Sequence, residues 1–88
     1  MRPIVFLSAK DVFEIHEHEI EQYGGSHGLR DLHLLESALH VPQAGMGETY
    51  FHPTLFHMAA AYAFHIANNH PFIDGNKRTA LASSLAFL

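Results

Sequence analysis

The alternation of apolar and polar positions predicts two helices in the first half of the chain. Residues 8–22 carry apolar side chains at helical spacing up to a pair of glycines, and Ser8 followed by Asp11 is typical of a capping box at a helix start. After the glycine-rich letters GGSHGLRD, Asp31 can cap a second, shorter helix that ends near Pro42. We therefore expect two amphipathic helices joined by a loop in which glycine permits left-handed backbone turns.

Helical periodicity is lost between residues 41 and 53. This segment contains two prolines and two glycines, which is typical of an exposed loop, and the letters ETYFH within it favour a short strand. A loop of this kind could cover a functional site.

A third helix is predicted over residues 54–69, directly after Pro53, which suits a helix start. Its letters TLFHMAAAYAFHIANN place apolar residues on more than one side, so we expect this helix at the centre of the fold. Pro71 ends it. Because a proline disfavours the α conformation of the residue before it, His70 is expected to be extended and displayed at the helix end.

A last helix is expected to be capped by Asn76 and to be buried, because residues 79–88 are almost wholly apolar. It stops at the letters AFL without a polar capping sequence, so we expect the natural domain to continue beyond Leu88. The predicted fold class is all-α. Residues 1–88 are expected to form a single compact bundle of four main helices, with the C-terminal helices of the domain missing.

The composition limits the kinds of partner that the chain can have. With 88 residues, of which 48% are hydrophobic, there is apolar material for one core. A net charge of −4 gives no bulk electrostatic reason to bind nucleic acid or an anionic membrane. The absence of cysteine excludes a disulfide scaffold, and the apolar run at residues 3–7 is too short for a signal peptide or a membrane span. We therefore expect a soluble, cytoplasmic protein without a nucleic-acid or membrane partner.

Nine histidines invite a search for a metal site, but their spacings do not match one. The letters HEHEI at residues 16–20 resemble the zinc-protease pattern H-E-x-x-H, yet the second ligand position holds Ile20. His33 and His40 flank Glu36, which is as typical of an amphipathic surface as of a ligand set. Six histidines are expected to be solvated or in loops without a role, namely His16, His18, His27, His33, His40 and His52.

The letters HPFIDGNKR at residues 70–78 concentrate chemistry in one loop. A histidine at a helix end, next to the start of another helix, places an imidazole beside an anion-binding position. His70 therefore suits a general base on an incoming hydroxyl. Asp74 is the carboxylate of the loop, and a hard oxygen ligand near phosphate-binding groups is typical of a Mg²⁺ site.

Four neighbouring residues suit the binding of phosphate. Gly75 allows successive backbone N–H groups to converge, Asn76 can donate its amide, and Lys77 and Arg78 can neutralise phosphate oxygens. Each residue alone also has an ordinary explanation as a helix stop, a turn, a cap or a solvated cation. Their combination in nine residues favours a functional site for metal-assisted phosphoryl or nucleotidyl transfer.

The letters HPFIDGNKR resemble the signature of the Fic/Doc family, H-x-F-x-[DE]-[GA]-N-[GK]-R. Lys77 makes the loop similar to the Doc (death-on-curing) toxin branch, because the Fic branch normally has glycine before the arginine. The letters YGGSHGLRD and LLESAL also resemble Doc segments, so the likeness covers nearly the whole chain.

The resemblance implies a compact α-helical fold and a division of roles within the loop. His70 would deprotonate a target hydroxyl, Asp74 would hold Mg²⁺, and Asn76 and Arg78 would bind the phosphates of ATP. The resemblance further implies a toxin that transfers the γ-phosphate of ATP to a threonine of elongation factor Tu, arrests translation and is neutralised by a Phd-type antitoxin. The family's inhibitory pattern, [ST]-x-x-x-E-[GN], does not occur in the sequence, which favours control by a separate antitoxin.

Three alternatives stay open at this stage. Typical Fic enzymes transfer AMP, and Gly75 matches their pattern, whereas the long cation Lys77 would crowd an α-phosphate and favours a nucleotide that presents its terminal phosphate. A catalytically inactive chain could instead act as a protein-interaction module. A metal-dependent hydrolase built on the histidines is the most remote of the three.

Overall fold

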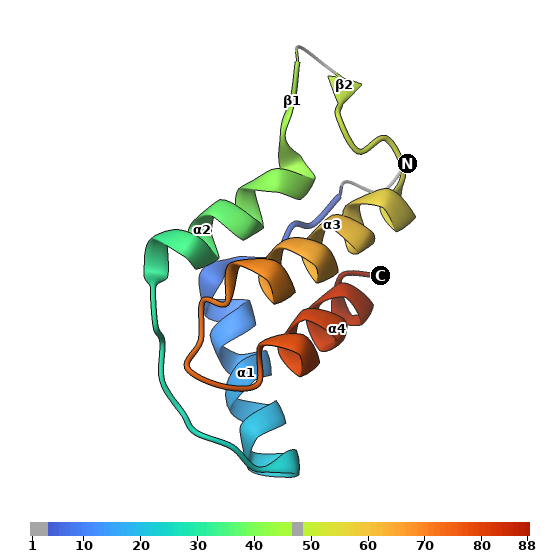
Figure 1. Cartoon of the computed structure of the whole chain (residues 1–88). Helices are drawn as coiled ribbons and strands as arrows, with labels where there is room; N and C mark the ends of the chain where they lie inside the picture. Colours follow the sequence, from blue (N-terminus) through green and yellow to red (C-terminus); the bar gives the residue numbers. More distant parts are fainter. Residues whose placement is uncertain (1–3, 47–48) are drawn as a thin grey trace.

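The structure, a computed structural model, describes residues 4–46 and 49–88, which form a helical bundle with a small hairpin at one end (Figure 1). The elements are, in chain order, α1 (Ala9–Tyr23), α2 (Leu32–His40), the short 3-10 helix η1 (Val41–Gln43), the antiparallel strands β1 (Gly45–Met46) and β2 (Thr49–Tyr50), α3 (Leu55–Asn69) and α4 (Asn76–Phe87). The predicted all-α class is therefore confirmed. Pro3 of the apolar N-terminal run and Glu48 of the predicted strand lie outside the described residues. None of the helices in the described ranges is both long and apolar enough to cross a membrane.

The first two helices begin where the sequence signals predict. At α1 the Asp11 N–H donates to Ser8 Oγ at 3.1 Å, and the Ser8 N–H donates to Asp11 Oδ2 at 2.8 Å. At α2 the Asp31 carboxylate accepts the Leu34 N–H at 3.1 Å. Each bond satisfies a backbone donor that helix geometry leaves free, so the predicted caps are confirmed.

Helix α3 lies between α2 and α4, and α1 packs against α4 (Figure 1). The α3 cap is Thr54, one residue after the predicted Pro53. Tyr62 and Ile66 of α3 are fully buried, as is Leu35 of α2. The central position predicted for this helix is therefore confirmed. The main buried cluster consists of Val12, Leu35, Ala38, Leu39, Tyr62, Ile66, Phe72 and Ala80.

Helix α4 packs its small side chains inward and its leucines outward. Thr79 and Ser83 are 0% exposed, whereas Leu81 and Leu85 are 59% and 62% exposed. The prediction of a wholly buried helix is therefore wrong for one face. Small side chains let α4 approach its neighbours closely, and the leucines, which lie on the opposite side of the helix, then remain in solvent.

The segment between α1 and α2 runs beside the loop between α3 and α4 and pairs with it. The Pro71 carbonyl accepts the N–H groups of Arg30 at 2.7 Å and of Asp31 at 3.0 Å. Two residues further on, the Ile73 N–H donates to the Gly28 carbonyl at 3.0 Å. These bonds tie the loop that carries the predicted chemistry to the other half of the chain.

Tyr62 anchors the N-terminal segment, and its substitution by phenylalanine tests that anchor. The side chain is 0% exposed, and its hydroxyl oxygen accepts the Leu7 N–H at 2.9 Å. Tyr62→Phe leaves this N–H without its partner, so we expect the free energy of unfolding to fall by about 1 kcal/mol in urea titrations. Tyr50→Phe, at a side chain that is 37% exposed, is the matched control and should have a smaller effect. Equal stability of Tyr62→Phe and the parent protein would contradict the assignment.

Candidate active site

His70 ends α3 in a left-handed backbone conformation, with φ 51° and ψ 54°. The prediction of an extended His70 is therefore wrong, although the residue is displayed at the helix end as expected. Pro71 disfavours the right-handed conformation of His70, and the left-handed one turns the chain sharply out of the helix. For a residue other than glycine this conformation costs about 1–3 kcal/mol, so surrounding contacts must hold it.

Arg30, from the segment before α2, provides such contacts. Its Nε donates to the His70 carbonyl at 2.6 Å, and its Nη2 donates to the Asn69 carbonyl at 2.9 Å. The last carbonyls of a helix lack partners within it and lie at its negative end, so a forked cation is favourable there. The sequence assigned Arg30 no role, because the two residues that it holds lie 39 and 40 positions further along the chain.

The Asn76 side chain closes the loop from the inside. Its Oδ1 accepts the Phe72 N–H and its Nδ2 donates to the Phe72 carbonyl, both at 2.9 Å. The prediction that Asn76 caps α4 is therefore wrong: the cap position is held by Gly75, with φ 74°. The reason is burial, because Asn76 and Phe72 are 5% and 2% exposed and their polar atoms must find partners within the protein.

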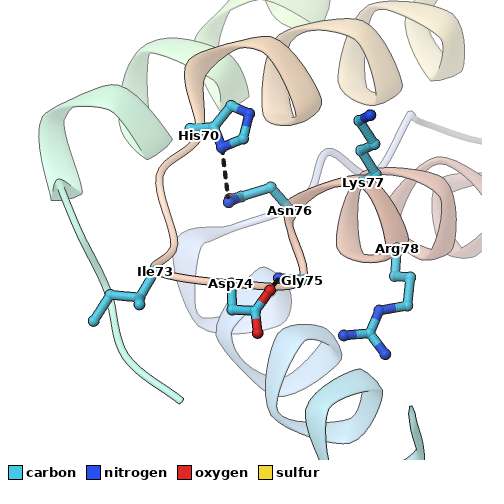
Figure 2. A pocket seen from close by; sticks show the side chains of 7 residues that line it. All are labelled: His70, Ile73, Asp74, Gly75, Asn76, Lys77 and Arg78. Carbon is cyan, nitrogen blue, oxygen red and sulfur yellow. Dashed lines mark hydrogen bonds between the residues drawn. The ribbon is translucent and has the colours of Figure 1, made fainter. Parts of the chain in front are cut away.

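The same amide fixes the resting state of the His70 ring (Figure 2). Because the Phe72 backbone determines which end of the amide carries the hydrogens, Asn76 Nδ2 faces His70 Nδ1, at 3.2 Å. Nδ1 therefore accepts, and the neutral ring carries its proton on Nε2. Figure 2 shows the second ring nitrogen directed toward the side on which Lys77 lies, away from Asp74.

Both carboxylate oxygens of Asp74 accept a backbone hydrogen bond. Oδ2 accepts the Ser26 N–H at 3.1 Å, and Oδ1 accepts the Gly75 N–H at 2.9 Å. These bonds, Ser26 first and Gly75 second, lower the pKa of the Asp74 carboxyl below its ordinary value, assisted by the charge of Arg78. Asp74 is therefore ionised at neutral pH. The favourable interaction of its carboxylate with the Ser26 and Gly75 N–H groups is lost only as the pH falls through the lowered pKa of the folded protein.

The Asp74 carboxylate fits Mg²⁺. Each of its oxygens retains a free lone pair after accepting one N–H, and the side chain is exposed. Across residues 4–46 and 49–88, no three His, Cys, Asp or Glu side chains are grouped so that they could hold a metal ion. A single carboxylate suits Mg²⁺ that keeps most of its water and takes its other ligands from phosphates. Gly25, with φ +116°, makes room, because a Cβ there would lie 2.7 Å from Asp74 Oδ2.

Lys77 and Arg78 leave α4 in opposite directions (Figure 2). Arg78 turns toward α1, where its Nη2 donates to the Gly24 carbonyl at 2.8 Å and its guanidinium lies 5.8 Å from the centre of the Tyr23 ring. Lys77 is exposed and points toward α3. The two cations at the start of α4 are therefore on different sides of the loop.

The site residues predicted from the sequence line one pocket of about 300 Å³. A second hollow on the α3 side adds Phe64, Ala67 and Asn68 and shares His70 and Lys77 with the first. His70 and Lys77 thus lie at the boundary between the two. The first pocket is lined by His70, Ile73, Asp74, Gly75, Asn76, Lys77 and Arg78.

His16 packs beside this site, so the prediction that it is a solvated or loop histidine is wrong. The ring is 4% exposed, it stacks on Phe72 with 3.8 Å between ring centres, and its Nε2 lies 2.8 Å from the Asp74 carbonyl oxygen. The signal was present in the sequence: Val12, His16 and Ile20 follow one another at intervals of four, and all three are buried. His18, His27, His33 and His40 are exposed as predicted, and His52 is half-buried.

Comparison with known proteins identifies the family. Residues 6–88 match the model of the Fic/DOC family. The chain is 42% identical over 66 residues to "Toxin Doc" of Mycolicibacterium smegmatis, in an alignment that covers 75% of this chain and 51% of that protein. It is 37% identical over 82 residues to "Protein kinase doc" of Escherichia phage P1, covering 93% of this chain and 64% of that protein.

The matches differ in the fraction of each protein that they cover. The aligned part spans between about half and two thirds of the length of the two relatives. The family match, in contrast, covers nearly the whole chain and includes the loop from His70 to Arg78. Because both relatives also carry the Doc name, the chain belongs to the Fic/Doc family, in its Doc toxin branch.

Proposed function

We propose that this chain acts as a Doc-type toxin that transfers the γ-phosphate of ATP to a threonine of elongation factor Tu and so arrests translation. The observation that carries the proposal is the pocket in which an imidazole, a carboxylate and two cations meet at the start of α4. The printed names of the two relatives, one a toxin and one a protein kinase, support it. A Phd-type antitoxin as partner and a cytoplasmic location belong to the same proposal.

The phosphates of ATP would bind at the N-terminal end of α4. The first N–H groups of a helix have no partner within it, and they present partial positive charge to an anion. Lys77 and Arg78 add full charges on opposite sides of this position, so together they can bracket a polyphosphate. The side-chain amide of Asn76 is already engaged within the loop, so its part is to hold the loop and to offer its backbone N–H.

A Mg²⁺ ion held by Asp74 would supply positive charge to the phosphate oxygens during transfer. His70 would take the proton of the threonine hydroxyl on Nε2, while the hydroxyl oxygen bonds to the γ-phosphorus and the bond to ADP breaks. For this step the ring must carry its own proton on Nδ1, so Asn76 must release Nδ1. The amide keeps both of its bonds to Phe72 when it does so, and only a 3.2 Å contact is lost.

Transfer of AMP is the second candidate function, because Gly75 matches the Fic pattern. The fold also favours glycine at position 75, however, whichever reaction the site performs. Its φ is +74°, and a Cβ there would lie 2.9 Å from Ile20 Cδ1. Its identity therefore does not separate the two reactions. Lys77, a long cation on the side where the His70 ring is open, would crowd an α-phosphate, and this favours transfer of the terminal phosphate.

ATP labelled at the α- or the γ-phosphate separates the two reactions. After incubation with elongation factor Tu and Mg²⁺, we expect label on the factor from γ-labelled ATP only, together with a phosphate-sized gain in its intact mass. Label from the α-phosphate would contradict the kinase function and support AMP transfer. A protein that shows no Mg²⁺-dependent ATP binding at all would instead be a protein-interaction module.

His70→Ala tests the base. The exposed side chain makes its deletion compatible with folding, so we expect an unchanged thermal midpoint and a loss of transfer of roughly 100- to 10,000-fold. His27→Ala, at an exposed histidine of the α1–α2 segment, is the matched control and should retain full transfer and toxicity. If His70→Ala arrests growth as strongly as the parent protein, the assignment of the base is wrong.

A further inference from the structure

The peptide group between Asp74 and Gly75 is held from both sides. The Asp74 carbonyl oxygen lies 2.8 Å from His16 Nε2, and the Gly75 N–H donates to Asp74 Oδ1 at 2.9 Å. The peptide is trans, so its C=O and N–H groups point in opposite directions. A hydrogen bond to the carbonyl therefore also determines where the Gly75 N–H points.

The backbone at Gly75 does not by itself prevent this peptide from turning over. Gly75 has φ 74°, and glycine tolerates both signs of φ, so the peptide plane before it can rotate with little change in the rest of a turn. The turned peptide would direct its carbonyl oxygen at the Asp74 carboxylate, where like partial charges repel. Oδ1 would lose its donor, and of the two backbone bonds to the carboxylate only that from Ser26, at 3.1 Å, would remain.

His16 is suited to control this peptide because its own ring is fixed. The ring is 4% exposed, and it lies flat on Phe72, with an angle of 6° between the ring planes. Phe72 is in turn tied through its backbone to Asn76. Since a carbonyl oxygen can only accept, His16 Nε2 must carry a proton, and a buried ring in one tautomer is a rigid donor.

We propose that His16 is a positioning residue of this site: by donating from Nε2 to the Asp74 carbonyl, it locks the Asp74–Gly75 peptide in the orientation that holds the Asp74 carboxylate for Mg²⁺ and ATP. The lock itself does not depend on the reaction, whereas its effect on Mg²⁺ rests on the proposed function. His16 acts through the loop and not on a substrate.

Two substitutions separate the hydrogen bond from the packing of the ring. His16→Phe keeps a flat ring on Phe72 and removes the donor, whereas His16→Gln removes the ring and keeps an N–H donor of similar reach. We expect His16→Phe to lose the protection of the Gly75 amide in hydrogen exchange of the metal-free protein. It should also weaken the binding of Mn²⁺ and ATP roughly tenfold, as is typical for groups that orient a metal ligand.

The conservative variant and a surface variant complete the experiment. His16→Gln should keep both the Gly75 protection and the affinity of the parent protein, and His18→Phe, on an exposed position of α1, should change neither. The opposite pattern, in which His16→Phe retains both properties and His16→Gln loses them, overturns the proposal in favour of ring packing.

Two further outcomes remain decisive. If the parent protein binds no Mn²⁺ with ATP, the metal site of the proposed function fails, and Gly75 exchange alone decides the role of His16. If His16→Phe does not fold, the ¹⁵N NMR spectrum of the parent protein decides. A slowly exchanging proton on His16 Nε2 supports the lock, and a neutral ring with its proton on Nδ1 overturns it.

Discussion

Backbone pairing between residues 28–31 and residues 71–73 is the constraint on which the rest of the site depends. The loop between α3 and α4 is short and carries polar groups that a helical bundle alone would not satisfy. Because its carbonyl at Pro71 and its N–H at Ile73 are both engaged by the segment before α2, the path of the loop is fixed at these two residues. The same pairing places the Ser26 N–H at the Asp74 carboxylate and the Arg30 guanidinium at the His70 carbonyl.

Features that depend on neighbouring residues were predictable from the sequence. The capping pair Ser8 and Asp11, the cap Asp31 and the central α3 follow from local spacing, and the structure has them where the pattern places them. The groups of the site were also predictable because they are close together in the sequence: nine consecutive residues hold the imidazole, the carboxylate and the two cations. The family could therefore be recognised from one stretch of sequence, and the comparisons agree with it.

Features that depend on distant residues could not be predicted. Arg30 and Ser26 have no local pattern that connects them with the loop, and their partners lie 40 and 48 positions away. Rules for single residues also failed where the site needs an exception. A residue before proline tends to be extended, but His70 is left-handed, and asparagine favours a cap, but Asn76 bonds to the backbone of Phe72. At His70 the contact with Arg30 outweighs a local preference of about 1–3 kcal/mol, whereas the bonds that displace Asn76 from the cap lie within the loop itself, four residues apart.

The pairing between the two loops also bears on the order of folding. Helices α3 and α4 with their loop contain all six of the predicted site residues, yet three residues that bond to this loop, His16, Ser26 and Arg30, lie 40 to 58 positions earlier than their partners. Contacts of such separation form late, because the chain must first lose the entropy of closing a long loop. During synthesis the chain would therefore contain all of residues 70–78 before the site exists. The pocket would form only when α1 docks on the loop between α3 and α4.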